Sequence, residues 1–110
     1  MTNIINYFDD DVRLEGMFFP LAGQEDAPVV LVVPTYAGRD QFTLDKAKAM
    51  NNLGYAGFAV DMYGEAKTGD SPEESMELMS RIMTNRPKLQ KRMLLAIEAA
   101  KSSNTTGLML

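Results

Sequence analysis

The residue types that most often act as nucleophile and general base are scarce in this chain. Its 110 residues contain no cysteine and no histidine, which removes the thiolate nucleophile and the commonest base. A serine nucleophile needs a base and often stands in a G-x-S-x-G turn. The serines of the chain are Ser71, Ser75, Ser80, Ser102 and Ser103. None of them stands in such a turn or in a Ser-x-x-Lys pair. The chain therefore shows no complete set of groups for covalent catalysis.

The best candidate for a site is the loop from Thr35 to Asp40. It follows the aliphatic run Val29–Val33, and ligands of open α/β sheets collect where parallel strands end. Arg39 offers a planar pair of donors for a substrate carboxylate, although a solvated loop charge explains it equally well. We expect Thr35, Tyr36 and Arg39 to contact substrate.

Asp61 and Tyr63 follow the next apolar segment and form a second candidate. Both can face the same crevice as the first loop. The alternative is structural, and we favour it: Asp61 caps the turn and Tyr63 packs over the strand ends. Tyr63 is kept as a candidate for substrate contact.

Other polar and apolar clusters have simpler explanations than a site. An acidic set suggests a hard metal ion, but three of its members fall in or near a helix first turn, where the helix dipole favours negative charge. That set is Glu65, Asp70, Glu73, Glu74 and Glu77. We expect no metal and no cofactor, and the absence of a G-x-G-x-x-G or Walker A loop argues against a nucleotide. The basic set Arg81, Arg86, Lys88, Lys91 and Arg92 is expected to face solvent.

Bulk properties narrow the class of protein. A net charge of −4 argues against general binding to nucleic acid or anionic membranes. The aliphatic run Val29–Val33 is far too short to span a bilayer. The first residues show no basic region or long apolar stretch, so we expect no signal peptide and a cytoplasmic protein.

The hydrophobic pattern predicts a single α/β domain over residues 1–110, with a parallel sheet between helices in three layers. An N-terminal β-hairpin is expected from residues 3–8 and 12–19. The further strands are expected at Val29–Val33, Tyr55–Val60 and Gly107–Leu110, and the helices at Asp40–Leu53, Pro72–Thr84 and Pro87–Lys101. A strand–helix–strand unit is almost always right-handed and yields a parallel pair. The stripe Met76, Met79 and Met83 is expected to pack in the core.

The order of these segments resembles the dienelactone hydrolase family of α/β hydrolases. The resemblance rests on the loop Tyr36-Ala37-Gly38, the strand entry Leu53-Gly54-Tyr55 and the exit Asp61-Met62-Tyr63-Gly64, and it covers essentially the whole chain. It implies hydrolysis of esters or lactones by a Cys or Ser on a G-x-C/S-x-G elbow, completed by Asp and His, all expected after Leu110. It also implies that the Tyr36 N–H contributes to the oxyanion hole.

The sequence departs from the pattern of that family at two positions. Thr35 stands where the family often has an acidic residue, and Gly64 and Glu65 occupy the region where it commonly has an arginine. Both departures argue against an anionic dienelactone as the substrate.

We therefore expect the N-terminal half of a hydrolase, inactive alone, which forms a homo-oligomer through its exposed sheet edge and helix faces. The alternatives are a small stand-alone α/β ligand-binding module and a protein-interaction module.

Overall fold

The computed structural model describes residues 3–23, 27–103 and 108–109 of the chain. The elements in order are β1 (Asn3–Asp9), β2 (Val12–Phe19), β3 (Val29–Val32), α1 (Gln41–Ala49), the 3₁₀ helix η1 (Met50–Leu53), β4 (Ala56–Ala59), α2 (Pro72–Met83), α3 (Arg86–Ser103) and β5 (Leu108–Met109). The predicted order of strands and helices is confirmed.

The strands form one sheet in the order β1-β2-β4-β3-β5. The predicted hairpin is present, and its second strand also pairs antiparallel with β4. β3 runs parallel to β4 and to β5, as predicted for strands joined by helical crossovers. Of the predicted third parallel strand, Leu108 and Met109 pair with Val29 and Val30. Its remaining positions, 107 and 110, lie outside the described residues.

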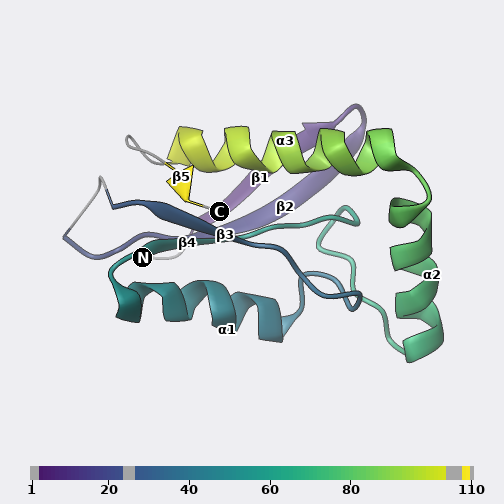
Figure 1. Ribbon diagram of the computed structural model, residues 1–110, viewed down its shortest axis with the longest axis horizontal. Helices are drawn as coiled ribbons and strands as arrows, with labels where there is room; N and C mark the ends of the chain where they lie inside the picture. Colours follow the sequence, from purple (N-terminus) through teal and green to yellow (C-terminus); the bar gives the residue numbers. More distant parts are fainter. Residues whose placement is uncertain (1–2, 24–26, 104–107, 110) are drawn as a thin grey trace.

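The sheet lies between two helices, which gives the predicted three layers (Figure 1). The larger core, on the α3 side, packs Phe18, Leu31 and Phe58 of the sheet against alanines of α3. On the other face, Ala47 of α1 packs against Phe19 and Ala59. α2 crosses the end of the sheet to which β3 and β4 run, so it faces the loops that follow these strands (Figure 1).

The helix ends show why the chain folds this way locally. The Asp40 carboxylate accepts a 3.1 Å hydrogen bond from the Thr43 N–H, and the Ser71 hydroxyl accepts one of 3.2 Å from the Glu74 N–H. Both residues are therefore N-caps. The helix predicted to continue through Leu53 instead ends at Ala49 and tightens into η1, which Gly54 closes at φ +89°.

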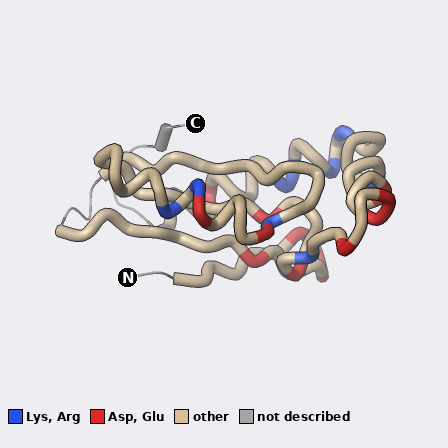
Figure 2. The backbone as a smooth tube through the Cα atoms, turned by 90° about the horizontal axis from the view of Figure 1, so that it is seen from below, with Lys and Arg blue, Asp and Glu red and all other residues tan. Residues whose placement is uncertain are grey.

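Two expectations about side chains on α2 and α3 were wrong. Met76 and Met83 are 52% and 58% exposed, because α2 turns Leu78 and Ile82 toward the core instead. Arg92 is buried rather than solvent-facing. At several places along the backbone, Lys and Arg positions lie close to Asp and Glu positions (Figure 2). Within the described residues, no helix combines the length and apolar character needed to cross a membrane.

Candidate functional site

An apolar cavity of about 290 Å³ lies where β3 and β4 end, next to α2 and the start of α3. The segment after β3 and the segment after β4 form one part of its wall, and the two helices form the rest. The lining residues are Val33, Pro34, Thr35, Tyr36, Met62, Tyr63, Met79, Ile82, Met83 and Leu89. The carboxyl ends of parallel strands are the expected place for a ligand in an open α/β sheet.

The loop after β3 is held by its own turn and by the loop after β4. The Gly38 N–H donates to the Thr35 carbonyl at 3.0 Å, and the Gly69 N–H donates to the Ala37 carbonyl at 3.1 Å. Gly38 has φ +91°, and a Cβ there would lie 2.4 Å from the Lys67 carbonyl oxygen. Only glycine lets the two loops approach this closely.

The loop after β4 is organised by Asp61, whose side chain is fully buried. Its Oδ1 accepts hydrogen bonds from the N–H groups of Tyr63 and Gly64 at 3.1 and 3.0 Å. Its Oδ2 accepts from the N–H groups of Glu15 and Ala66 at 2.9 and 2.7 Å. Four backbone donors satisfy this buried carboxylate, so Asp61 has the structural, turn-capping role that the sequence favoured.

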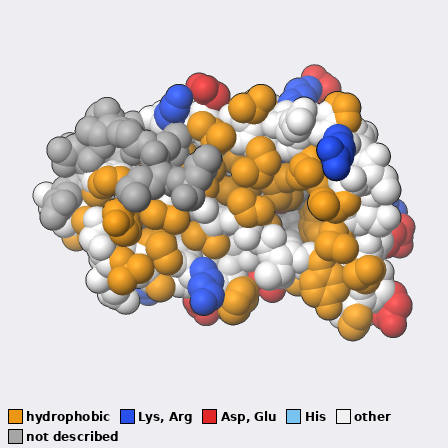
Figure 3. All heavy atoms as spheres, in the orientation of Figure 1, with side chains coloured by type: hydrophobic (Ala, Val, Ile, Leu, Met, Phe, Trp, Pro, Cys, Tyr) orange, Lys and Arg blue, Asp and Glu red, His pale blue; other side chains and the backbone are white. Residues whose placement is uncertain are grey.

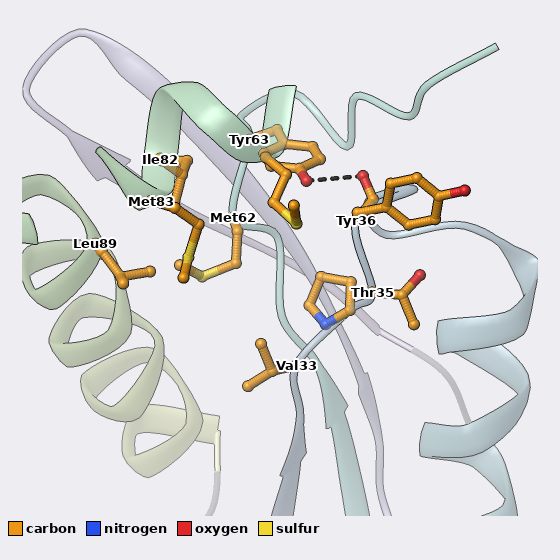
Figure 4. A pocket seen from close by; sticks show the side chains of 10 residues that line it. Val33, Thr35, Tyr36, Met62, Tyr63, Ile82, Met83 and Leu89 are labelled. Carbon is orange, nitrogen blue, oxygen red and sulfur yellow. Dashed lines mark hydrogen bonds between the residues drawn. The ribbon is translucent and has the colours of Figure 1, made fainter. Parts of the chain in front are cut away.

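Tyr63 joins the two loops directly. Its hydroxyl donates a 2.7 Å hydrogen bond to the Tyr36 carbonyl, shown as the dashed line in Figure 4. Burial raises the pKa of the Tyr63 hydroxyl above its usual value of 10.0, so at neutral pH the group is protonated and able to donate. The Tyr36 N–H, in contrast, has no acceptor among the described residues.

The structure brings three of the predicted site residues together and leaves the fourth apart. Thr35, Tyr36 and Tyr63 all line the cavity. Arg39 does not: its guanidinium is buried and lies 2.7 Å from the Glu15 carboxylate. A buried guanidinium needs a counter-charge, and Glu15 on β2 supplies it. Arg39 thus has a structural ion pair in place of the expected substrate contact.

The sequence reasoning missed a buried ionic cluster behind the cavity. The Arg92 Nε donates to the Asp9 carboxylate at 2.9 Å, and an Arg92 terminal nitrogen donates to the Met62 carbonyl at 2.7 Å. Lys91 Nζ lies 2.7 Å from the other Asp9 oxygen. The hydrogen bonds from Lys91 and Arg92 hold the pKa of the Asp9 carboxyl below its ordinary 3.8. Asp9 and Arg92 are 83 positions apart, so no local pattern points to their pairing.

The arrangement places an apolar cavity beside the Tyr36 N–H, which has no acceptor among the described residues. No group of three or more potential metal ligands occurs within the described ranges 3–23, 27–103 and 108–109. The polar side-chain atoms around the cavity are hydroxyls rather than bases. Among the described residues that line the cavity, none is a His, Asp, Glu or Lys that could take a proton from a nucleophile.

Comparison with known proteins identifies a family whose model matches most of this sequence. The family model described as the dienelactone hydrolase family matches residues 15–108. A search of curated proteins found no significant match.

Solved structures share the fold. A dienelactone hydrolase-like promiscuous phosphotriesterase from metagenomic libraries superimposes with a TM-score of 0.86 at 22% identity, over 98% of this chain and 46% of that chain. A structure named m3DLH gives a TM-score of 0.81 at 22% identity, over 90% of this chain and 42% of that one. A dienelactone hydrolase from Anabaena variabilis ATCC 29413 gives 0.63 at 16% identity, over 98% and 50%.

This chain spans about half the length of those three proteins. Their identities to it are low, so they show the fold alone, whereas the family model covers most of the sequence. The fold, the two loops at the strand ends and the family match agree, and the chain belongs to the dienelactone hydrolase family.

Proposed function

We propose that this chain forms the N-terminal part of an ester or lactone hydrolase. In that enzyme it would bind the acyl group and supply the Tyr36 N–H to the oxyanion hole. One observation carries the proposal: Tyr36 lines the apolar cavity at the end of β3, and its N–H has no acceptor among the described residues. In α/β hydrolases a backbone N–H from the loop after this strand stabilises the oxyanion.

The proposed reaction proceeds through an acyl-enzyme. A Cys or Ser nucleophile attacks the carbonyl carbon of the ester or lactone, and the carbonyl oxygen becomes an oxyanion that accepts a hydrogen bond from Tyr36. Collapse of this intermediate expels the alcohol of an ester or opens the ring of a lactone, and water then releases the acid. The 110 residues contain neither Cys nor His, so we assign nucleophile, orienting Asp and His base to sequence outside them.

The proposal predicts that the 110-residue chain has no hydrolase turnover alone. Its serines are far from the required arrangement: the Ser71 hydroxyl, for example, caps α2 through the Glu74 N–H. Purified chain and p-nitrophenyl acetate should give no saturable hydrolysis above the buffer rate. Saturable turnover that survives mutation of every serine and of Tyr36 would contradict the assignment.

A direct test of the oxyanion role removes the N–H itself. Tyr36 is the second residue of the turn closed by Gly38 and Thr35, a position that proline commonly occupies. In the product of the complete reading frame that contains this chain, Y36P should lower kcat by about 10²–10³ relative to Y36A, which keeps the N–H. Equal rates for Y36P and Y36A would exclude the oxyanion role, and unchanged circular dichroism and melting would show that both variants fold.

We also propose that the isolated chain self-associates through its exposed apolar surface. Hydrophobic side chains gather between α3 and α1 and extend toward α2 (Figure 3). Phe42 on α1 and Leu94 on α3, neither of which lines the cavity, are 55% and 63% exposed. Exposed apolar patches of this kind favour association. Light scattering should give at least a dimer mass for the 110-residue chain, and a monomer at the same concentration would refute this proposal.

A further inference from the structure

We propose that the cavity accepts a neutral, apolar acyl group and discriminates against a ligand that carries a carboxylate. This inference rests on the proposed function because it names the substrate class of the same site. It begins with the wall of the cavity: no Asp, Glu, Lys or Arg is among the described residues that line it, and methionine, leucine, isoleucine and valine side chains supply much of its surface. In Figure 4 the side chains of Met62, Met83 and Leu89 point toward one another, whereas the Tyr36 ring points away from them.

Two of the polar side chains at the cavity, those of Tyr63 and Thr35, already have hydrogen-bond partners. The Tyr63 hydroxyl donates to the Tyr36 carbonyl at 2.7 Å, and the Thr35 hydroxyl oxygen accepts from the Ala37 N–H at 3.4 Å. A carboxylate placed among the methionines would lose part of its hydration, and none of the described residues in the wall is a cation. Burying an ionised group without a partner is strongly unfavourable.

Lysine and arginine side chains lie nearby, but they line a different cavity. A smaller cavity of about 150 Å³ is lined by Lys67, Arg81, Lys88 and Arg92. It shares only Tyr63 and Ile82 with the apolar cavity. Two of its cations are already paired, Arg92 with Asp9 and Arg81 with Glu77. The two cavities therefore separate the cations from the space proposed for the acyl group.

The volume sets the size of the acyl group. A cavity of about 150 Å³ lined by aliphatic side chains holds benzene. At about 290 Å³, the cavity described here has room for one aromatic ring with a short chain attached. A benzoyl or phenylacetyl ester fits this description.

The test measures binding on the 110-residue chain, without any catalytic step. Protein carrying methyl-labelled methionine is titrated with methyl benzoate and, separately, with benzoate, and the methionine methyl signals are followed by NMR at physiological ionic strength. Methyl benzoate should give saturable shifts at Met62, Met79 and Met83, and benzoate should bind about ten-fold more weakly or less. Equal binding of the two compounds, or no saturable shift with methyl benzoate, would overturn the inference.

Two matched variants test whether the cavity wall sets the preference for methyl benzoate over benzoate. Met83 lines the cavity, whereas Met76, also exposed on α2, does not and lies about two turns or 10 Å away. That distance exceeds the Debye length of about 8 Å in physiological salt. M83K should therefore bind benzoate at least about five-fold more tightly than the parent chain, and M76K should leave the preference unchanged. The same gain in both variants, or in neither, would refute a preference set by the cavity wall.

This test and that of the proposed function can fail separately. If the chain binds methyl benzoate more tightly than benzoate but Y36P does not slow the complete enzyme, the cavity preference stands and the oxyanion role of Tyr36 is excluded. If Y36P slows the complete enzyme strongly but benzoate and methyl benzoate bind equally well, the oxyanion role stands and the cavity preference is excluded.

Discussion

The Tyr63 hydroxyl donates a 2.7 Å hydrogen bond to the Tyr36 carbonyl, and this bond joins the loops that follow β3 and β4. The same two loops meet again where Gly38 bridges to Thr68. Tyr36 is the residue proposed to donate to the oxyanion. Tyr63 is thus a positioning residue for the loop, acting through backbone geometry.

Removing the Tyr63 hydroxyl should loosen the loop without unfolding the protein. We expect Y63F to cost about 1 kcal/mol, the net contribution of a typical hydrogen bond. The Gly38 and Gly69 amides, which close the loop contacts, should exchange with solvent about five-fold faster. The control is Y36F, because the Tyr36 hydroxyl has no hydrogen bond among the described residues. Unchanged exchange in Y63F, or an equal increase in Y36F, would show that the bond does not hold the loop.

The buried ion pair between Asp9 and Arg92 should contribute strongly to stability. Both side chains are about 5% exposed, so D9N leaves a buried guanidinium without its counter-charge and should cost about 3 kcal/mol. D10N removes the neighbouring carboxylate, which also contacts Lys91 but is 85% exposed, and should cost less than about 1 kcal/mol. Urea unfolding of the two variants measures the difference. Similar losses in both would mean that burial does not determine the strength of the pair.

The same carboxylate predicts the response of the fold to acid. The pKa of Asp9 is lower in the folded chain than its ordinary 3.8, chiefly through the hydrogen bond from Lys91. A depressed folded pKa contributes stability that is present above the unfolded pKa and lost as the pH falls through the folded one. The free energy of unfolding should therefore decline below about pH 4. In D9N this decline should be shallower, and parallel pH profiles for the parent chain and D9N would contradict the assignment.

Gly57 is predicted to be essential for packing α1 on the sheet. A Cβ at Gly57 would lie 2.0 Å from the Ala47 carbonyl oxygen, so backbone would have to move. G57A should cost about 3 kcal/mol. At Gly54 an added Cβ meets nothing within 4 Å, and only the positive φ of 89° opposes it, so G54A should cost about 1 kcal/mol. Thermal or urea unfolding would contradict this account if G57A were no worse than G54A.

The sequence was sufficient to predict the layers of the fold because each element carries a local signal. The aliphatic run Val29–Val33 predicts a strand buried on both faces, and Ser71 before Pro72 predicts a helix start. Both signals depend on neighbouring residues, and the structure contains both elements.

The errors concern side chains whose surroundings come from distant parts of the chain. Met76 and Met83 have helical spacing, but that spacing does not tell which face of α2 meets α3. Arg39 and Arg92 are buried because Glu15 and Asp9 lie beside them in space. Ion pairs between distant residues leave no periodic pattern in a single sequence, whereas the position of Thr35, Tyr36 and Tyr63 at strand ends follows from topology.

The most direct test of the central claim compares this chain with the product of the complete reading frame that contains it, using p-nitrophenyl acetate as the substrate. The account predicts that the frame continues past codon 110 into a G-x-C/S-x-G turn followed by Asp and His. The longer product should show saturable hydrolysis, and the 110 residues alone should show none. Saturable hydrolysis by the 110 residues alone, or a complete frame without those groups, would contradict the claim that this chain binds and polarises the substrate while reactive groups from outside it perform the chemistry.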